Sequence, residues 1–426
     1  MNRVIGLRFC LTCDRVCLYS SGVQRPNRIL LIRPSALGDV CRTVPVLASL
    51  RAAYPEARID WLVQEEYAQA IAAHPALDAV VPFPRRKLGR GWPVSATGRR
   101  IVRDLLRNIR GDGGDRETGR GRSGGGYDLV VDAQGLFRSG LLTGLSGAGV
   151  RLGYANAAEW AWFFYNRQVI VPNDQHAVDR MLSLLSGVGV HPAPEAGLRT
   201  PAGAWEELSA SAPALERIAG RYLLVAPTSR WPGKRWPAER FDATVAALLD
   251  RGLIEGAAVV ASESERDQCG PLLERAARDD RVVDLVGRTT VGGLLAAVER
   301  SGLVLANDSA AVHVAVGFDK PLVGLFGPTR VEHNGPWRRD GDVLTGGPVP
   351  AGVTHKDARA GAELMGRIGV ERVIEACAHR LSVGEPRSVH IGRDGSVGEP
   401  VFGELMGEGA GAARPAGASA VRDASA

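Results

Sequence analysis

The sequence contains few aromatic residues, and its apolar residues never form a long uninterrupted run. Phe, Trp and Tyr make up 6% of the 426 residues. No segment alternates basic and aromatic residues in the way that stacks bases, which argues against a nucleic-acid-binding protein. No run of about 18 apolar residues is present, which argues against a transmembrane helix. Arg8, Asp14 and Arg15 interrupt any apolar core near the start, so no signal peptide is predicted.

Cysteine and metal-ligand patterns are sparse too. The six cysteines are Cys10, Cys13, Cys17, Cys41, Cys269 and Cys377. The first three form a Cys-x2-Cys-x3-Cys group without the further ligands that a metal site needs, and the others are scattered, as in a reducing compartment. The eight histidines are dispersed. We therefore expect a cytoplasmic protein with no bound metal.

The chain does contain enough apolar residues for two domains, and it carries a mild positive charge. Apolar residues make up 45% of the sequence, and the formal net charge is +5. This length and apolar content suffice for two domains of ordinary size, each with its own core. The positive charge fits anionic partners such as nucleotides, phosphorylated glycans or an acidic membrane surface.

Short apolar segments alternate with amphipathic segments through most of the chain. The order predicts an α/β fold with two Rossmann-like, doubly wound parallel-sheet domains facing a cleft. Residues 66–75 are expected to form a helix, and the aromatic segment at 159–172 fits no single element. The predicted boundaries are a disordered leader at 1–26, a first domain at 27–190 with a flexible insertion at 108–126, a linker at 191–214, a second domain at 215–380 and a disordered tail at 381–426.

Ligands of doubly wound sheets bind beyond the carboxyl ends of the strands, so the residues after each predicted strand are the candidate site. Asp308 and Ser309 follow one such strand, and Ala310 begins a helix of small residues whose N–H groups a phosphate can approach. His313 projects from the same helix face as Ser309. The alternative is that Asp308 only caps the helix and His313 is a buried structural residue.

Two further strand ends carry polar side chains. Thr228 and Ser229 follow one strand, and Lys234 comes shortly after; hydroxyls and a cation suit a diphosphate, although a solvated basic loop is equally consistent. Glu263 follows another strand and can accept hydrogen bonds from a base or ribose. Glu265 is its rival, and either can simply begin the next helix. The loop that carries Thr228, Ser229 and Lys234 is not a P-loop, because no Gly-x4-Gly-Lys-Ser/Thr string is present.

Asp39 lies where the first strand gives way to a helix in the other half. There it would face the cleft from the opposite wall, and a carboxylate in that place can take a proton from an incoming hydroxyl. The alternative is a helix cap after a glycine turn. No Gly-x-Gly-x-x-Gly string follows the strand, so an NAD enzyme is not predicted.

Four stretches resemble one family when they are taken together and in order. They are RPSALGDVCRTVPVLASLRAAYPEARIDWLV, YDLVVDAQGLFRSGLL, APTSRWPGKRWPAERF and NDSAAVHVAVGFDKPLVGLFGPT. They resemble the heptosyltransferases of lipopolysaccharide core synthesis, glycosyltransferase family 9, over about residues 28–337. The resemblance implies a GT-B fold, with the acceptor site in the first domain and the nucleotide-sugar site in the second. It also implies inverting, metal-independent transfer, usually from ADP-L-glycero-D-manno-heptose.

The resemblance assigns roles to individual residues. Asp39 matches the family's proposed general base. The implied nucleotide-sugar-binding residues are Thr228, Ser229, Lys234, Glu263, Asp308, Ser309, Ala310 and His313. Ser309 and Ala310 stand where the family motif usually has Thr and Gly, so an added methyl group lies where backbone meets phosphate. The insertion, the leader, the tail and the absence of a cysteine-containing segment after Trp337 depart from the family pattern.

The resulting hypothesis is an inverting glycosyltransferase that moves a sugar, most simply heptose from ADP-heptose, to a lipid-linked or lipopolysaccharide-core glycan. Asp39 is the expected base, and Arg138 is expected to bind the acceptor. No cofactor, metal or nucleic acid is expected; the inner-membrane surface is a possible peripheral partner. One alternative is a GT-B enzyme that uses another nucleotide sugar. The other is a non-catalytic nucleotide-sugar or glycan-binding protein, which would need no base.

Overall fold

The computed structural model describes residues 25–87, 95–111, 126–193, 197–218 and 222–383. The sequence predictions for the leader, the insertion and the tail concern residues that lie almost wholly outside these ranges. Those predictions therefore stay as they were made, and so do the predicted domain boundaries.

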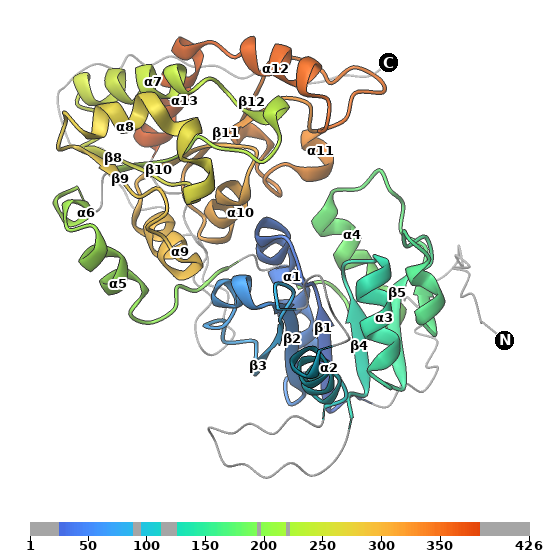
Figure 1. The fold of residues 1–426 in the computed structure, drawn as a ribbon. Coiled ribbons are helices and arrows are strands. Elements are labelled where there is room, and N and C mark those ends of the chain that lie inside the picture. Colours follow the sequence, from blue (N-terminus) through green and yellow to red (C-terminus); the bar gives the residue numbers. More distant parts are fainter. Residues whose placement is uncertain (1–24, 88–94, 112–125, 194–196, 219–221, 384–426) are drawn as a thin grey trace, which may run out of the picture. The chain divides into compact units, whose positions relative to one another are not determined.

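Six parallel strands form the first sheet, in the order β3-β2-β1-β4-β5-β6 (Figure 1). The central strands β1 and β4 consist mainly of Ile, Leu and Val, and these residues are buried on both faces, as a parallel sheet between two helical layers requires. The strands are β1 Arg28–Ile32, β2 Arg58–Gln64, β3 Ala79–Phe83, β4 Leu129–Asp132, β5 Val150–Tyr154 and β6 Arg167–Val169. The helices are α1 Leu37–Ala53, α2 Ala96–Ile109, α3 Phe137–Leu145 and α4 Ala177–Leu184, with 3₁₀ helices η1 Glu65–Ala70, η2 Ala161–Phe164 and η3 Leu185–Val188.

The second sheet has the same design, six parallel strands in the order β12-β11-β10-β7-β8-β9. Its strands are β7 Tyr222–Ala226, β8 Gly256–Val259, β9 Val282–Asp284, β10 Leu303–Asn307, β11 Leu322–Phe326 and β12 Val343–Thr345. Its helices are α5 Ala204–Ser211, α6 Ala214–Arg217, α7 Ala238–Asp250, α8 Gly270–Ala276, α9 Val291–Arg300, α10 Ala310–Gly317, α11 Val331–Asn334, α12 Ala358–Gly366 and α13 Val370–Val383, with 3₁₀ helices η4 Pro232–Lys234, η5 Glu263–Cys269 and η6 Asp340–Asp342. The predicted α/β fold with two doubly wound sheets is confirmed.

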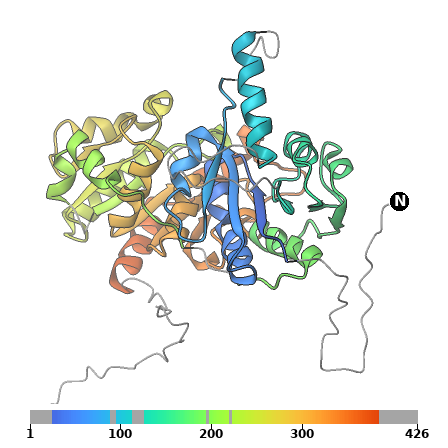
Figure 2. The ribbon, with the colours of Figure 1, turned by 90° about the horizontal axis from the view of Figure 1, so that it is seen from below.

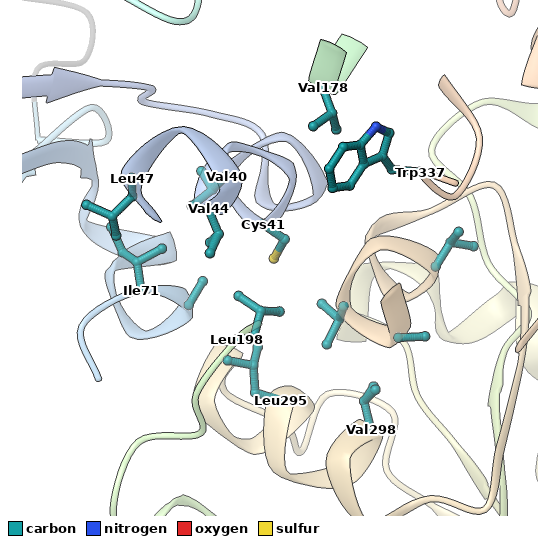
Figure 3. Packing of buried hydrophobic residues seen from close by; sticks show 14 of the residues in the cluster. Val40, Cys41, Val44, Leu47, Ile71, Val178, Leu198, Leu295, Val298 and Trp337 are labelled. Atoms are coloured by element: carbon teal, nitrogen blue, oxygen red, sulfur yellow. The ribbon is translucent and has the colours of Figure 1, made fainter. Parts of the chain in front are cut away.

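Helices α1 and α10 pack against each other. Helix α1 directly follows β1 and helix α10 directly follows β10, and each of these strands lies in the middle of its sheet. Side chains of α1 lie in one apolar cluster with residues of two other regions (Figure 3). One region is the segment that connects the two sheets, and the other is helix α9 of the second sheet. Val40 and Val44 of α1 share this cluster with Leu198 and Leu295. The starts of α1 and α10, where candidate residues were predicted, are therefore brought together by apolar burial.

One predicted segment differs from the structure. Residues 66–75 were predicted to be a helix, but only the 3₁₀ helix η1 forms and turns follow it. Gln69 of η1 accepts a hydrogen bond from the backbone N–H of Gly292 at 2.9 Å, so a tertiary contact competes with a regular helix here. Helix α5 lies within the range 191–214, whose role as a linker stays a prediction. In the described ranges, none of the helices combines the length and the apolar character needed to cross a bilayer.

Candidate functional site

A cavity of about 1060 Å³ opens at the carboxyl ends of strands from both sheets. Its walls come from the segments after β1 and β2 of the first sheet and after all six strands of the second sheet. Nine of the ten residues singled out from the sequence line it: Asp39, Thr228, Ser229, Lys234, Glu263, Asp308, Ser309, Ala310 and His313. The tenth, Arg138, is exposed on α3 and is not among the residues that line the cavity.

Asp39 is the third residue of α1 and lies between two guanidinium groups. Arg33 Nη2 is 2.9 Å from one carboxylate oxygen, and Arg42 forms a closer ion pair with the other. Burial by itself would raise the pKa of Asp39, but the charges of Arg33 and Arg42 outweigh it and hold that pKa well below its usual range. The Ala36 N–H also donates to the carboxylate at 3.4 Å, so Asp39 contributes to the helix start as well.

Sequence reasoning did not single out Arg33 and Arg42. Arg33 directly follows β1, and its Nη1 donates to the Ala133 carbonyl at 2.7 Å. Arg42 stands three residues after Asp39 on α1, and its Nη1 donates to Asn334 Oδ1 of α11 at 3.4 Å. The signal available in the sequence was this spacing, because residues three apart on a helix are neighbours.

The start of α10 supplies the opposite wall of the cavity. Lys234 Nζ lies 2.7 Å from Asp308 Oδ2, and both side chains are largely buried. Ser309 precedes the first helical residue, Ala310, and its side chain makes no capping hydrogen bond. The first N–H groups of α10 are therefore available to an anion in the cavity.

His313 of α10 is buried against the start of α1. A Cβ atom on Gly38 would come within 2.8 Å of His313 Cδ2, so the ring packs directly on this glycine. Burial, followed by the charge of Arg42, lowers the pKa of His313 well below its usual value and keeps the ring neutral. His313 therefore lines the cavity and also packs against α1. The sequence had offered these as alternatives: a residue of the ligand site or a buried structural residue.

The loop after β7 is braced from within. The Thr228 and Ser229 side chains are buried. Arg235 Nε donates to the Ser229 carbonyl at 2.8 Å, so this arginine orients the loop. Asn307 Nδ2 donates to the Pro227 carbonyl at 2.6 Å, while Asn307 Oδ1 accepts from the Trp236 N–H at 3.2 Å. Asn307 therefore ties the loop after β7 to the end of β10, a role that sequence reasoning missed.

The two glutamates after β8 differ in their surroundings. Glu265 accepts from the Ser262 hydroxyl at 2.6 Å, as an acid that begins a helix does. Glu263 is exposed, pairs with Arg266 at 2.9 Å and lies against Gly287, with its carboxylate at the cavity wall. The hydrogen bond from Arg266 lowers the pKa of Glu263. Both glutamates line the cavity, so the choice of Glu263 over Glu265 stays a prediction.

Within the described ranges, no three residues of the types His, Cys, Asp and Glu come close enough together to hold a metal ion. Positive charge at the cavity comes from Lys234, Arg230 and Arg330 on one wall and from Arg33 and Arg42 near the other.

Comparisons with known proteins agree with this architecture. The family model described as glycosyltransferase family 9 (heptosyltransferase) matches residues 119–354. Lipopolysaccharide heptosyltransferase 1 of Pseudomonas aeruginosa is 31% identical over 328 residues, which cover 73% of this chain and 82% of that protein. Lipopolysaccharide heptosyltransferase 1 of Escherichia coli K12 is 27% identical over 309 residues, covering 71% and 88%.

A solved structure gives the same result for the fold. The E. coli heptosyltransferase WaaC with ADP superposes with a TM-score of 0.64 at 23% identity, covering 83% of this chain and 99% of that one. The same enzyme with ADP-2-deoxy-2-fluoro heptose has a TM-score of 0.62, covering 82% of this chain and 98% of that one. The two doubly wound sheets and these superpositions show a GT-B fold, and the family model together with the Pseudomonas relative makes the chain a glycosyltransferase. The chain belongs to glycosyltransferase family 9, the heptosyltransferase family.

Proposed function

We propose that the protein transfers a heptose from ADP-heptose to an anionic glycan acceptor of the lipopolysaccharide core, with inversion at the anomeric carbon. One observation carries the proposal: the carboxylate of Asp39 and the start of α10 with Lys234 line the same cavity from two different sheets. A base on one wall and a diphosphate site on the other are the two parts that an in-line displacement needs.

The donor side is formed by the second sheet. The Lys234 ammonium group, the Thr228 and Ser229 hydroxyls and the first N–H groups of α10 surround the place where a diphosphate would lie. As the bond between the anomeric carbon and the phosphate oxygen breaks, negative charge grows on the diphosphate, and these groups stabilise it. Glu263, at the rim of the same wall, would accept hydrogen bonds from the nucleoside.

The acceptor side is formed by α1. The acceptor hydroxyl oxygen bonds to the anomeric carbon from the face opposite the diphosphate, its proton passes to Asp39, and ADP leaves. Arg33 and Arg42 keep Asp39 charged, but they also make it a weak base. A carboxylate or phosphate on the acceptor would bind these guanidinium groups, weaken their hold on Asp39 and raise its pKa. The arginines therefore favour an anionic acceptor.

The relatives are named lipopolysaccharide heptosyltransferases, which supports a role in lipopolysaccharide synthesis. We infer that the protein works in the cytoplasm on an acceptor held at the inner membrane. No metal has a part in the proposed mechanism, because Lys234 and the α10 N–H groups supply the charge stabilisation at the diphosphate.

The first test is calorimetry of ADP, UDP and GDP binding to the purified protein, with EDTA in the buffer. Preferred binding of ADP supports the proposal and justifies assays with ADP-heptose, in which ADP release must depend on the acceptor. Preferred binding of UDP or GDP would leave the proposed glycosyltransferase mechanism in place but would contradict heptose as the transferred sugar. Binding of ADP without acceptor-dependent release would favour a non-catalytic binding protein.

A further inference from the structure

An exposed aromatic cluster lies on the first half of the protein, outside the cavity. Trp160 and Phe163 are each 73% exposed, and Trp162 is 36% exposed. The rings of Trp160, Trp162, Phe163 and Phe164 contact one another in sequence order, at centroid distances of 5.7 to 6.4 Å. Aromatic residues are few in this chain, so their concentration on the surface marks an interaction site.

The backbone of this cluster is held firmly by helix α3. Gly140 lies against Ala161, where an added Cβ would approach backbone and side chain to 3.0 Å, and Gly144 lies against Phe164, where it would approach to 2.8 Å. Trp160 adopts a left-handed conformation with φ of 64°. The close packing on the two glycines holds this uncommon conformation and leaves Trp160 and Phe163 directed to the surface.

A strongly basic surface adjoins the aromatic cluster. Helix α2 and the residue after it carry five exposed arginines, and Asp104 is the only acidic residue of the helix. The arginines are Arg99, Arg100, Arg103, Arg107 and Arg110. Helix α2 packs next to α3 (Figures 1 and 2), and Arg110 Nε donates to the Leu145 carbonyl at the end of α3 at 3.3 Å. Arg138, which does not line the cavity, stands beside the exposed Phe137 at the start of α3.

The arginines of α2 are arranged on the outer side of the helix. Leu105 and Ile109 are buried in an apolar cluster with the sheet, so this side anchors α2 to the fold. Arg99, Arg103, Arg107 and Arg110 instead line a shallow hollow together with Val102 and Leu106. Cations grouped around a few apolar side chains, next to exposed Trp and Phe, are the pattern of a surface that meets lipid headgroups.

We propose that α2, the start and end of α3, and the aromatic segment at 160–163 form one docking surface for an anionic phospholipid bilayer. Trp and Phe side chains favour the boundary between water and acyl chains, and the arginines would lie among the headgroup phosphates. Six exposed arginines of this surface outnumber two acidic residues, Asp104 and the adjoining Glu159, so its charge is predominantly positive and matches an anionic bilayer. The inference builds on the proposed function, since a lipid-borne acceptor requires the enzyme at the membrane.

The test is co-sedimentation of the full chain with vesicles of phosphatidylcholine alone or mixed with phosphatidylglycerol. We expect binding to the mixed vesicles only, with affinity falling as salt is added. Two variants probe the two parts: Trp160→Ser/Phe163→Ser and Arg103→Gln/Arg107→Gln. The arginine variant should bind at least about tenfold more weakly, given a loss of about fivefold for each cation removed. The aromatic variant should also bind more weakly, because it loses the burial of two apolar rings at the bilayer boundary. Arg251→Gln/Arg278→Gln, at exposed sites in the second half, is the matched control and should bind like the unmodified protein.

Unchanged binding of both test variants to the mixed vesicles would overturn the proposal, and so would absence of binding by the unmodified protein. ADP affinity, measured on every variant, should stay the same because none of these residues lines the cavity. Measuring ADP affinity together with vesicle binding therefore distinguishes failure of the docking surface from failure of the proposed function. Loss of vesicle binding with normal ADP binding supports the docking surface, whereas failure of sugar transfer with normal vesicle binding counts against the proposed function alone.

Discussion

At the scale of single residues, the environment of Asp39 decides what its carboxylate can do. Arg33 and Arg42 approach both oxygens, and the neutral His313 ring lies on the neighbouring Gly38. The carboxylate is therefore charged at every pH at which the protein is expected to work. Its basicity depends on what the two arginines do when an acceptor binds.

Asp39→Asn removes the proposed base and keeps the size of the side chain. We expect kcat to fall by about 10²- to 10⁴-fold, as is typical when a general base is lost, while ADP affinity stays the same. The measurements are steady-state kinetics and calorimetry. Asp78→Asn is the matched control, because Asp78 also pairs with an arginine, Arg51 at 2.6 Å, but lies outside the cavity. A variant at position 39 with the unmodified rate would contradict the base role.

Arg42→Gln should shift the pH dependence of the reaction. The charge of Arg42 lowers the pKa of Asp39, so removing it lets burial raise that pKa. The base form of Asp39 then begins to be lost at a higher pH as the solution is acidified, and the acid limb of kcat/KM moves upward in pH. KM for the acceptor should also rise. Superimposable pH profiles of Arg42→Gln and the unmodified enzyme would contradict this account, and Arg51→Gln serves as the control.

At the scale of helices and strands, α1 and α10 form the junction around which the site is built. Each follows a central strand, and small residues at their starts allow close approach. Gly38 is the tightest point, because the His313 ring occupies the space that a side chain would need.

Gly38→Ala should push these helices apart. A Cβ at 2.8 Å from a ring carbon requires α1 or the ring to move, and we expect a loss of about 1 to 3 kcal/mol in the free energy of unfolding together with weaker ADP binding. Urea denaturation and calorimetry measure both effects. His313→Ala should recover part of the stability loss in the double variant. Gly366→Ala is the control, since a Cβ there meets no atom within 4 Å.

At the scale of the whole described structure, the two sheets share one apolar cluster. That cluster includes Ile29 and Leu31 of β1 as well as Leu224 of β7 and Val304 of β10. Burial that continues through both halves couples their unfolding, and a ligand that binds in the shared cavity stabilises both.

Thermal unfolding should therefore occur in one transition, and ADP should raise its midpoint. At a free ADP concentration of about 100 times Kd the free energy of unfolding increases by about 2.7 kcal/mol. Scanning calorimetry with and without ADP measures the effect, with inorganic phosphate at equal concentration as the control. Two separate transitions, of which ADP moves only one, would contradict the coupling.

Much of this fold was predictable because local rules and global architecture agree. Buried strands such as β1 and β10 are continuous apolar runs, and the parallel order follows from the helices between them. The residues after the strands could be chosen for the same reason, and nine of the ten line the cavity. Residues 66–75 were harder to predict, because the contact of Gln69 with Gly292 comes from a distant part of the chain.

The amino-acid sequence alone determined the α/β class, the two-sheet plan and the positions of the candidate residues at strand ends, because hydrophobic periodicity and turn chemistry act over a few residues. It also carried the family resemblance, through four motif stretches in a fixed order. Only the tertiary structure decided that Arg33 and Arg42 enclose Asp39, that Asn307 braces the loop after β7 and that Arg138 lies on the surface beside the aromatic cluster. These outcomes depend on contacts between segments far apart in the chain, where direction and distance are set by packing.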